Sequence, residues 1–206
     1  MSPTRSPTSR SRPTVTQWLE VRRHAQRRKP EQNLAQEGVD LARATSTAGR
    51  SFARVVTSAV PCAVQTAVAM GHAVDEEDPW LSSLGQVVSA EIEWDAGFRG
   101  FHDAIRSHRA TELYARMQAM LWRQVLTEVQ DGEDVLIVTH GGIAEAGAIA
   151  SASWTDLDSW GDELGYCEGM RLRYEDGECR EVRLYRFEHG DEVEAGAAAA
   201  EGAVAR

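Results

Sequence analysis

Two histidines and an arginine stand where extended, partly apolar segments of the sequence end. Arg23 and His24 close one such segment, Ser58 closes a second and His140 follows a third. An imidazole can attack phosphorus as a nucleophile, and a guanidinium pairs with two phosphate oxygens through its planar fork. These residue types at strand ends therefore predict an anion site suited to phosphate. Arg22 points to the opposite face of its strand and is expected to be structural.

The pattern around these residues predicts strands alternating with helices. Strands are expected at residues 17–23, 52–58 and 134–139, with a closing hairpin at 170–174 and 181–187. Helices are expected at residues 34–50, 61–71, 110–130 and 143–151, with Pro61 in a first turn and Gly71 at a helix end. This order predicts an α/β fold, in which ligands sit at the carboxyl ends of the strands.

The composition is that of one packed domain, expected over residues 15–188. The chain has 206 residues, of which 42% are hydrophobic and 26% charged. Residues 1–14 are rich in Ser, Thr, Pro and Arg, and residues 189–206 alternate Ala, Gly and Glu, so both are expected to be disordered tails. Apolar runs fall far short of the ~20 residues of a membrane span. No secretory segment is recognised in the first thirty residues, and a cytoplasmic protein is expected.

Charge and cysteine usage argue against two classes of partner. The net charge is −10, although residues 1–30 carry eight basic side chains and one acidic. The acidic body would repel a phosphate backbone, so nucleic acid is not expected as a partner. The three cysteines form no CxxC or CxxH pair, and His102 and His108 lie six apart. Neither a disulfide framework nor a metal site is therefore predicted.

Four separated blocks resemble the motifs of the histidine phosphatase superfamily, the family of phosphoglycerate mutase. Residues 21–25, Val-Arg-Arg-His-Ala, resemble its Arg-His-Gly motif with alanine in place of glycine. Residues 34–38 resemble a Leu-Thr-x-x-Gly helix start, and residues 57–67 resemble Ser-Ser-x-Leu-x-Arg-Ala-x-Gln-Thr-Ala. Residues 138–142 match the second histidine motif. The resemblance covers about residues 17–187. It implies a three-layer sandwich with a mostly parallel central sheet flanked by helices, catalysis without a cofactor and a small phosphorylated substrate.

The resemblance also implies a role for each residue. His24 would be the nucleophile that forms a phosphohistidine, and Arg23 and His140 would hold the charge that develops on the phosphoryl oxygens. Ser58 and Gly141 would bind substrate, Gly141 because its N–H can approach the phosphate closely without a side chain in the way.

A proton donor for the leaving group is expected between the two histidine motifs or just after the second, as in the family. Residues 93–100 resemble the first of these segments, with a spacing one residue off. Glu93 is the candidate chosen, and Glu91, Asp95 and Glu145 remain alternatives.

Cys62 stands where the family motif has a second phosphate-binding arginine. A lost charge-assisted hydrogen bond of about 1.5–3 kcal/mol would weaken phosphate binding roughly ten- to hundredfold. A cysteine-phosphatase role is disfavoured, because such enzymes place an arginine six residues further on and this chain has Val68 there.

The sequence therefore favours a phosphomonoester phosphatase acting through His24, weakened by Cys62. The alternative is an impaired pseudo-phosphatase that binds a phosphorylated ligand or a protein partner. A mutase is disfavoured, because residues 72–110 show no recognisable cradle that would hold the product for re-phosphorylation. Neither the substrate nor the oligomeric state is predicted.

Overall fold

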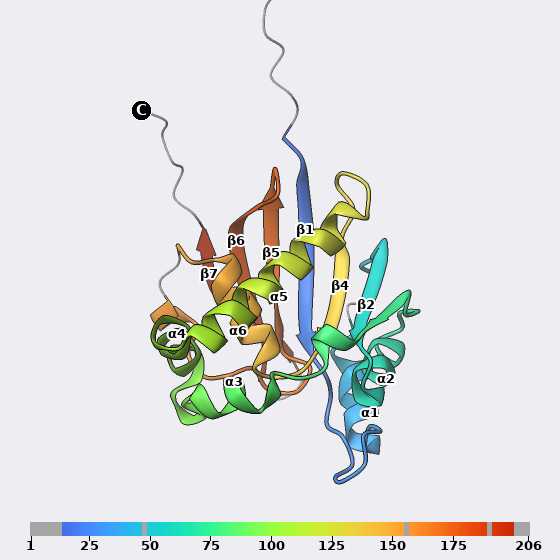
Figure 1. The fold of residues 1–206 in the computed structure, drawn as a ribbon. Helices are drawn as coiled ribbons and strands as arrows, with labels where there is room; N and C mark the ends of the chain where they lie inside the picture. The colour runs from blue at the N-terminus through green and yellow to red at the C-terminus, as the bar shows by residue number, and fades with distance from the viewer. Residues whose placement is uncertain (1–13, 47–48, 155–156, 189–190, 200–206) are drawn as a thin grey trace, which may run out of the picture.

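A seven-stranded mixed sheet, in the order β3-β2-β4-β1-β5-β6-β7, forms the centre of the computed structural model (Figure 1). The structure describes residues 14–46, 49–154, 157–188 and 191–199. Strands β3, β2, β4 and β1 are mutually parallel, and β5, β6 and β7 continue the sheet antiparallel. The strands are β1 Thr16–Arg23, β2 Arg54–Ser58, β3 Glu76–Asp78, β4 Val135–Thr139, β5 Gly169–Glu175, β6 Glu178–Glu188 and β7 Asp191–Ala199.

Helices cover the sheet and connect its strands. They are α1 Gln36–Ala44, α2 Pro61–Ala69, α3 Gly85–Glu91, α4 Gly97–Ser107, α5 Arg109–Thr127 and α6 Ile143–Ser151. Short 3-10 turns lie at η1 Pro79–Leu81, η2 Trp94–Ala96 and η3 Leu157–Ser159. In the part of the chain that the structure describes, no helix is both long and apolar enough to cross a membrane.

Both faces of β4 are buried, which explains its continuous apolar sequence. In β4, Val135 and Ile137 belong to the main core, which also holds residues of α4, α5 and α6. Leu136 and Val138 point the other way and pack with Ala63 of α2 in a separate apolar cluster. Figure 1 shows α5 and α6 lying across the sheet beside β1 and β5.

The predicted α/β class is confirmed, and most of the main elements begin and end close to the predicted residues, whereas the helix expected over residues 34–50 spans only Gln36–Ala44. Helix α6 has the predicted bounds, and β1, β2 and β4 differ from prediction by two residues or fewer. The structure adds β3, α3 and α4 within residues 72–110, where no element was predicted. The sheet is mixed: β3, β2, β4 and β1 are parallel, whereas the pairs β1–β5, β5–β6 and β6–β7 are antiparallel.

The structure departs from the prediction of a disordered tail over residues 189–206. Asp191–Ala199 form β7, which pairs antiparallel with β6. An Ala- and Glu-rich segment has a weak strand propensity, but backbone hydrogen bonds to an existing edge strand do not depend on side-chain type. Residues 1–13, 189–190 and 200–206, which also belong to the two predicted tails, lie outside the described residues.

Candidate active site

The register of β1 and β4 brings the two histidines together. These strands are adjacent and parallel, and Arg23 pairs with Thr139. The backbone N–H of His24 donates to the carbonyl of Thr139 at 2.8 Å. The residue that directly follows each strand is a histidine, and the His24 and His140 ring centroids lie 4.8 Å apart at an interplanar angle of 65°. Strand β2 lies on the other side of β4 and brings Ser58 beside His140.

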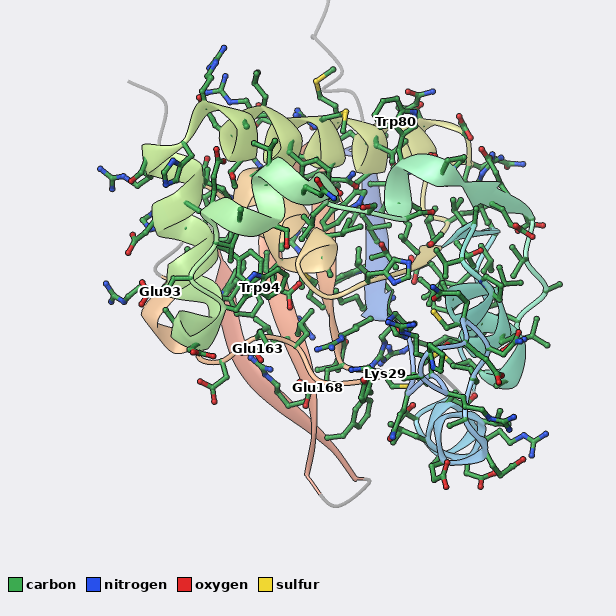
Figure 2. The ribbon with its side chains drawn as sticks, turned by 60° about the horizontal axis from the view of Figure 1, so that its bottom comes forward. Lys29, Trp80, Glu93, Trp94, Glu163 and Glu168 are labelled. Atoms are coloured by element: carbon green, nitrogen blue, oxygen red, sulfur yellow. The ribbon has the colours of Figure 1, made fainter. Side chains whose placement is uncertain are left out.

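A cavity of about 250 Å³ opens at these strand ends. Figure 2 views the molecule from this end and labels three residues that line the cavity, Lys29, Trp94 and Glu163. Four of the predicted site residues also line it, namely Arg23, His24, His140 and Gly141. The other three, Ser58, Cys62 and Glu93, are not among the lining residues.

His24 is held with one nitrogen available for chemistry. Its Nδ1 lies 2.6 Å from the carbonyl oxygen of Ala25. A carbonyl only accepts hydrogen bonds, so Nδ1 carries the proton and Nε2 keeps its lone pair. Burial lowers the pKa of His24. The Ala25 bond opposes this shift, and the positive charges of Arg23 and Arg27 add to it. The imidazole is therefore neutral at neutral pH, which is the nucleophilic form.

His140 is oriented from behind by a hydroxyl network. Its Nε2 forms a 2.7 Å hydrogen bond with Ser58 Oγ. Ser58 Oγ also hydrogen-bonds Ser82 Oγ at 3.0 Å and accepts from the backbone N–H of Val60 at 3.1 Å. Burial and the neighbouring His24, Arg27 and Arg23 lower the pKa of His140 to about 4. Ser58 thus positions a histidine, whereas the sequence had placed it against the substrate.

Arg23 packs closely on the floor of the cavity. Its guanidinium lies over the Tyr166 ring, 4.8 Å from the centroid, and donates to the carbonyl of Leu164. Its Nε is buried without a hydrogen-bond partner. A Cβ at Gly141 would lie only 3.1 Å from Arg23 Nε and Cζ. Glycine at this position therefore leaves room for the arginine side chain.

Comparison with family models identifies the family of the chain. The model of the histidine phosphatase superfamily (branch 1) matches residues 12–186. The chain belongs to the histidine phosphatase superfamily. The family that the four motif blocks predicted is therefore confirmed. A comparison with curated proteins finds no match.

Solved structures of histidine phosphatase type share the fold at low sequence identity. A phosphoglycerate mutase from Bacillus anthracis str. Sterne is 14% identical with a TM-score of 0.54, and the match covers 81% of this chain and 91% of that chain. A phosphoserine phosphatase mutant from Entamoeba histolytica, in complex with phosphoserine, is 13% identical with a TM-score of 0.53, over 88% and 96% of the two chains. A mycobacterial glucosyl-3-phosphoglycerate phosphatase in complex with VO3 is 20% identical with a TM-score of 0.54, over 81% and 96%. These likenesses show the phosphoglycerate mutase-like fold.

Cys62 lies below the cavity of this histidine phosphatase, in the first turn of α2. Its side chain is fully buried and packs in an apolar cluster with Ala25 and Met70. Its Sγ lies within 4.8 Å of ring nitrogens of both His24 and His140. Burial raises the pKa of the thiol, and the charge of Arg27 opposes this. The cysteine therefore lies next to both histidines but does not line the cavity.

Arg27 supplies positive charge that the motif comparison did not assign. It lines the cavity, is half-buried and lies on the loop that follows β1. Its charge acts on His24, His140 and Cys62, lowering the pKa of all three. The feature of the sequence that could have indicated Arg27 is the basic run at residues 27–29, which begins three residues after His24.

The carboxylates are arranged differently from the prediction. Glu93 is exposed, and Figure 2 shows it at the margin of the molecule, away from Lys29. Glu145 is fully buried and lines the cavity. Its Oε2 accepts from Gly142 N at 2.6 Å and its Oε1 from Leu164 N at 3.0 Å. Burial raises the pKa of Glu145 despite these bonds. Glu145, which the sequence offered as an alternative proton donor, therefore lines the cavity, and Glu93, the donor chosen from the sequence, does not.

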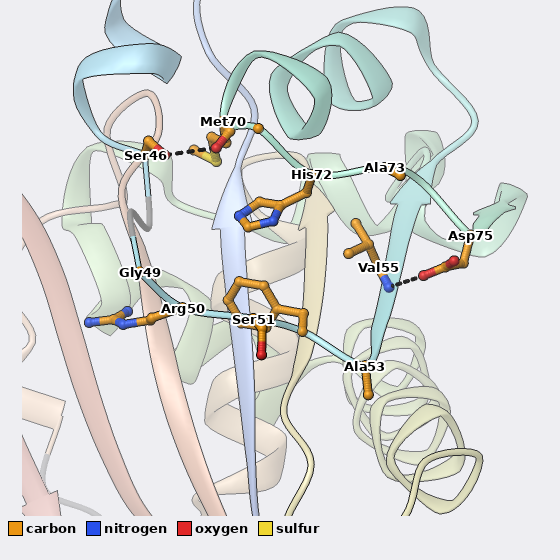
Figure 3. A pocket seen from close by; sticks show the side chains of 12 residues that line it. Ser46, Gly49, Arg50, Ser51, Ala53, Val55, Met70, His72, Ala73 and Asp75 are labelled. Carbon is orange, nitrogen blue, oxygen red and sulfur yellow. Dashed lines mark hydrogen bonds between the residues drawn. The ribbon is translucent and has the colours of Figure 1, made fainter.

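A larger cavity of about 530 Å³ lies near the start of β2 (Figure 3). At its edges Ser46 Oγ donates to the Met70 carbonyl at 2.7 Å and Val55 N donates to Asp75 Oδ2 at 2.8 Å. None of the predicted site residues lines it. The smaller cavity is the better candidate, because convergent polar groups with perturbed pKa values mark a site more specifically than volume does.

Proposed function

We propose that the protein hydrolyses small phosphomonoesters through a phosphohistidine on His24. Membership of the histidine phosphatase superfamily supports a phosphatase-type function. The observation that carries the finer proposal is the neutral, buried His24 imidazole, whose Nε2 lone pair is free while Nδ1 is held by the Ala25 carbonyl. The phosphoserine and VO3 in two of the similar structures suggest the size and charge of the substrate group.

In this mechanism His24 Nε2 attacks phosphorus while the ester P–O bond breaks. The alcohol oxygen leaves with a proton from Glu145, which lines the cavity and whose raised pKa favours the protonated form. Water then attacks the phosphohistidine and gives a proton to the Glu145 carboxylate. The P–N bond breaks, and inorganic phosphate leaves. No cofactor is needed for either step.

Positive charge and donors stabilise the phosphoryl oxygens. Arg23 faces the cavity with a buried Nε that has no protein partner, so a phosphate oxygen would satisfy it. Arg27 provides the second cationic contact, because its charge already reaches both histidines. His140 donates to a third oxygen. In this arrangement Arg27 supplies part of the positive charge that is missing at position 62, where the family motif has an arginine and this chain has Cys62.

The test is phosphoenzyme formation with a radiolabelled aryl phosphate. Wild-type protein should trap an acid-labile label, and His24→Ala should trap none while keeping its circular dichroism spectrum. His108→Ala, at an exposed histidine, is the matched control and should label like wild type. Labelling of a folded His24→Ala protein would exclude His24 as the nucleophile.

A second candidate function follows from Cys62. With one phosphate-binding arginine missing, the site could bind a phosphorylated ligand or partner without turnover. That pseudo-phosphatase would bind vanadate or phosphate measurably but form no phosphoenzyme and release no phosphate.

A further inference from the structure

Three nitrogen and sulfur donors converge at the base of the cavity. A ring nitrogen of His24, a ring nitrogen of His140 and the Sγ of Cys62 all lie within 4.8 Å of one another. They come from the ends of β1 and β4 and from the first turn of α2. No two of these residues are close in sequence, and for this reason the spacing of cysteines and histidines indicated no metal.

The donor types select a particular class of metal. Two imidazoles and one thiolate suit Zn²⁺, whereas Mg²⁺ and Ca²⁺ prefer oxygen ligands. Three protein ligands leave one coordination position open for water or an anion, as in exchangeable zinc sites. The cavity gives a metal ion a route to the two histidine rings, and the buried Cys62 Sγ lies within 4.8 Å of both.

The three donor atoms need to move only a short distance to bind a metal ion. Even if all three donor separations were 4.8 Å, an ion at their centre would lie about 2.8 Å from each, against Zn–N of about 2.0–2.1 Å and Zn–S of about 2.3 Å. Each donor would therefore move inward by less than about 1 Å. Small rotations of three side chains can supply such shifts.

The donors are already held by neighbouring groups. The Ala25 carbonyl fixes the ring of His24, and the Ser58 hydroxyl fixes that of His140. Thr66 joins the two chain segments, because its Oγ1 accepts from Ala25 N at 2.9 Å and donates to the Cys62 carbonyl at 2.7 Å. Hydrogen bonds that orient histidines in this way are characteristic of metal sites.

The charges nearby can be balanced. The guanidinium groups of Arg23 and Arg27 line the same cavity and repel a cation. Binding of Zn²⁺ releases the Cys62 thiol proton to solvent, so the thiolate cancels one of the two metal charges. An anion in the open position, held by the same arginines, cancels the other.

We propose that His24, His140 and Cys62 form a Zn²⁺ site, and that metal binding there occupies the His24 imidazole and stops phosphoryl transfer. The metal site stands on the donor geometry alone. The inhibition rests on the proposed function.

The site is tested by titrating the full-length protein with Co²⁺, whose spectrum reports its ligands. Wild type should bind one Co²⁺ per chain, with a sulfur-to-cobalt charge-transfer band and the visible bands of a tetrahedral ion, and Zn²⁺ should displace it. Cys62→Ala, which keeps an apolar side chain in the cluster, should lose the charge-transfer band and bind more than about tenfold more weakly. Cys167→Ala, at a buried cysteine of the same apolar cluster, should keep the charge-transfer band and the wild-type affinity for Co²⁺. The absence of a band in wild type, or its persistence in folded Cys62→Ala, would overturn the site.

The inhibition is tested separately with aryl phosphate turnover. Zn²⁺ should inhibit wild type over the concentration range in which it displaces Co²⁺, and half-inhibition of Cys62→Ala should need at least about tenfold more metal. Unchanged turnover at saturating Zn²⁺ would overturn the inhibitory half of the proposal. A cobalt band in a protein with no turnover at all would leave the metal site standing and reject the phosphatase.

Discussion

Replacement of Glu20 by glutamine should strongly destabilise the protein, because the carboxylate neutralises a buried arginine in β1. The side chains of Glu20 and Arg22 are both fully buried, with Oε1 and Nε 2.7 Å apart. Arg50 reaches the other carboxylate oxygen at 2.8 Å. Arg22 Nη1 donates to the Cys167 carbonyl at 3.2 Å, Cζ lies 5.0 Å from the Tyr185 ring centroid, and Nη2 is buried without a hydrogen-bond partner. No other acidic group is seen to pair with Arg22 among the described residues.

The size of the effect follows from burial. Removing one partner of a buried ion pair costs about 3–5 kcal/mol, a large part of the about 5–15 kcal/mol that stabilises a domain. For a protein of this size the melting temperature should fall by about 6–20 °C. Thermal and urea unfolding followed by circular dichroism measure this change.

A matched control separates burial from loss of charge. Glu112→Gln removes a carboxylate that pairs with Arg109 and Arg116 on the surface of α5, and should change the melting temperature far less. The double substitution Glu20→Leu with Arg22→Met should recover much of the loss, since apolar side chains can replace a buried pair. If Glu20→Gln shifts the midpoint no more than Glu112→Gln, the buried charge is compensated in another way and the reasoning is wrong.

Three further predictions concern the cavity. Arg27→Gln should weaken inhibition by vanadate about ten- to hundredfold, whereas Arg28→Gln, at an exposed arginine 3.8 Å from Glu31, should not. His140→Ala should lower kcat by about 10²–10³-fold in a folded protein, and unchanged turnover would place the chemistry elsewhere. Cys62→Arg should tighten vanadate binding about tenfold and remove the cobalt charge-transfer band. Equal vanadate inhibition in folded Cys62→Arg and wild type would mean that Arg27 already fills this role.

The parts of the fold that were predictable are those with two buried faces or a clear helical stripe. β4 could be predicted because its five residues are all buried, and α6 because an apolar run follows the Gly141-Gly142 turn. α4 was missed because Gly97 and Gly100 lower its helix propensity. Its helical form depends on burial of Phe98 and Phe101 against distant residues, a tertiary effect that the local sequence does not express.

The candidate site was predictable where it depends on strand ends and not where it depends on loops. Arg23, His24 and His140 follow adjacent parallel strands, so the topology alone brings them together. The choice of Glu93 or Glu145 as the proton donor depended instead on the path of residues 92–96, which connect α3 and α4. Glu93 directly precedes the short η2 turn and is exposed, whereas Glu145 lies in the first turn of α6, shortly after the second histidine motif.

The residue at position 62 affects anion and cation binding in opposite directions. Replacing a guanidinium by the buried Cys62 thiol removes one unit of positive charge within 4.8 Å of ring nitrogens of both histidines, and metal binding, which releases the thiol proton, removes a second unit. At an effective dielectric constant of about 20, one unit charge at this distance contributes about 3 kcal/mol for each charge on the ligand. A phosphate is therefore disfavoured and a divalent cation favoured by the same substitution. Phosphate binding then depends on Arg23 and Arg27, so the Arg27→Gln variant should shift the preference of the site from vanadate toward Zn²⁺.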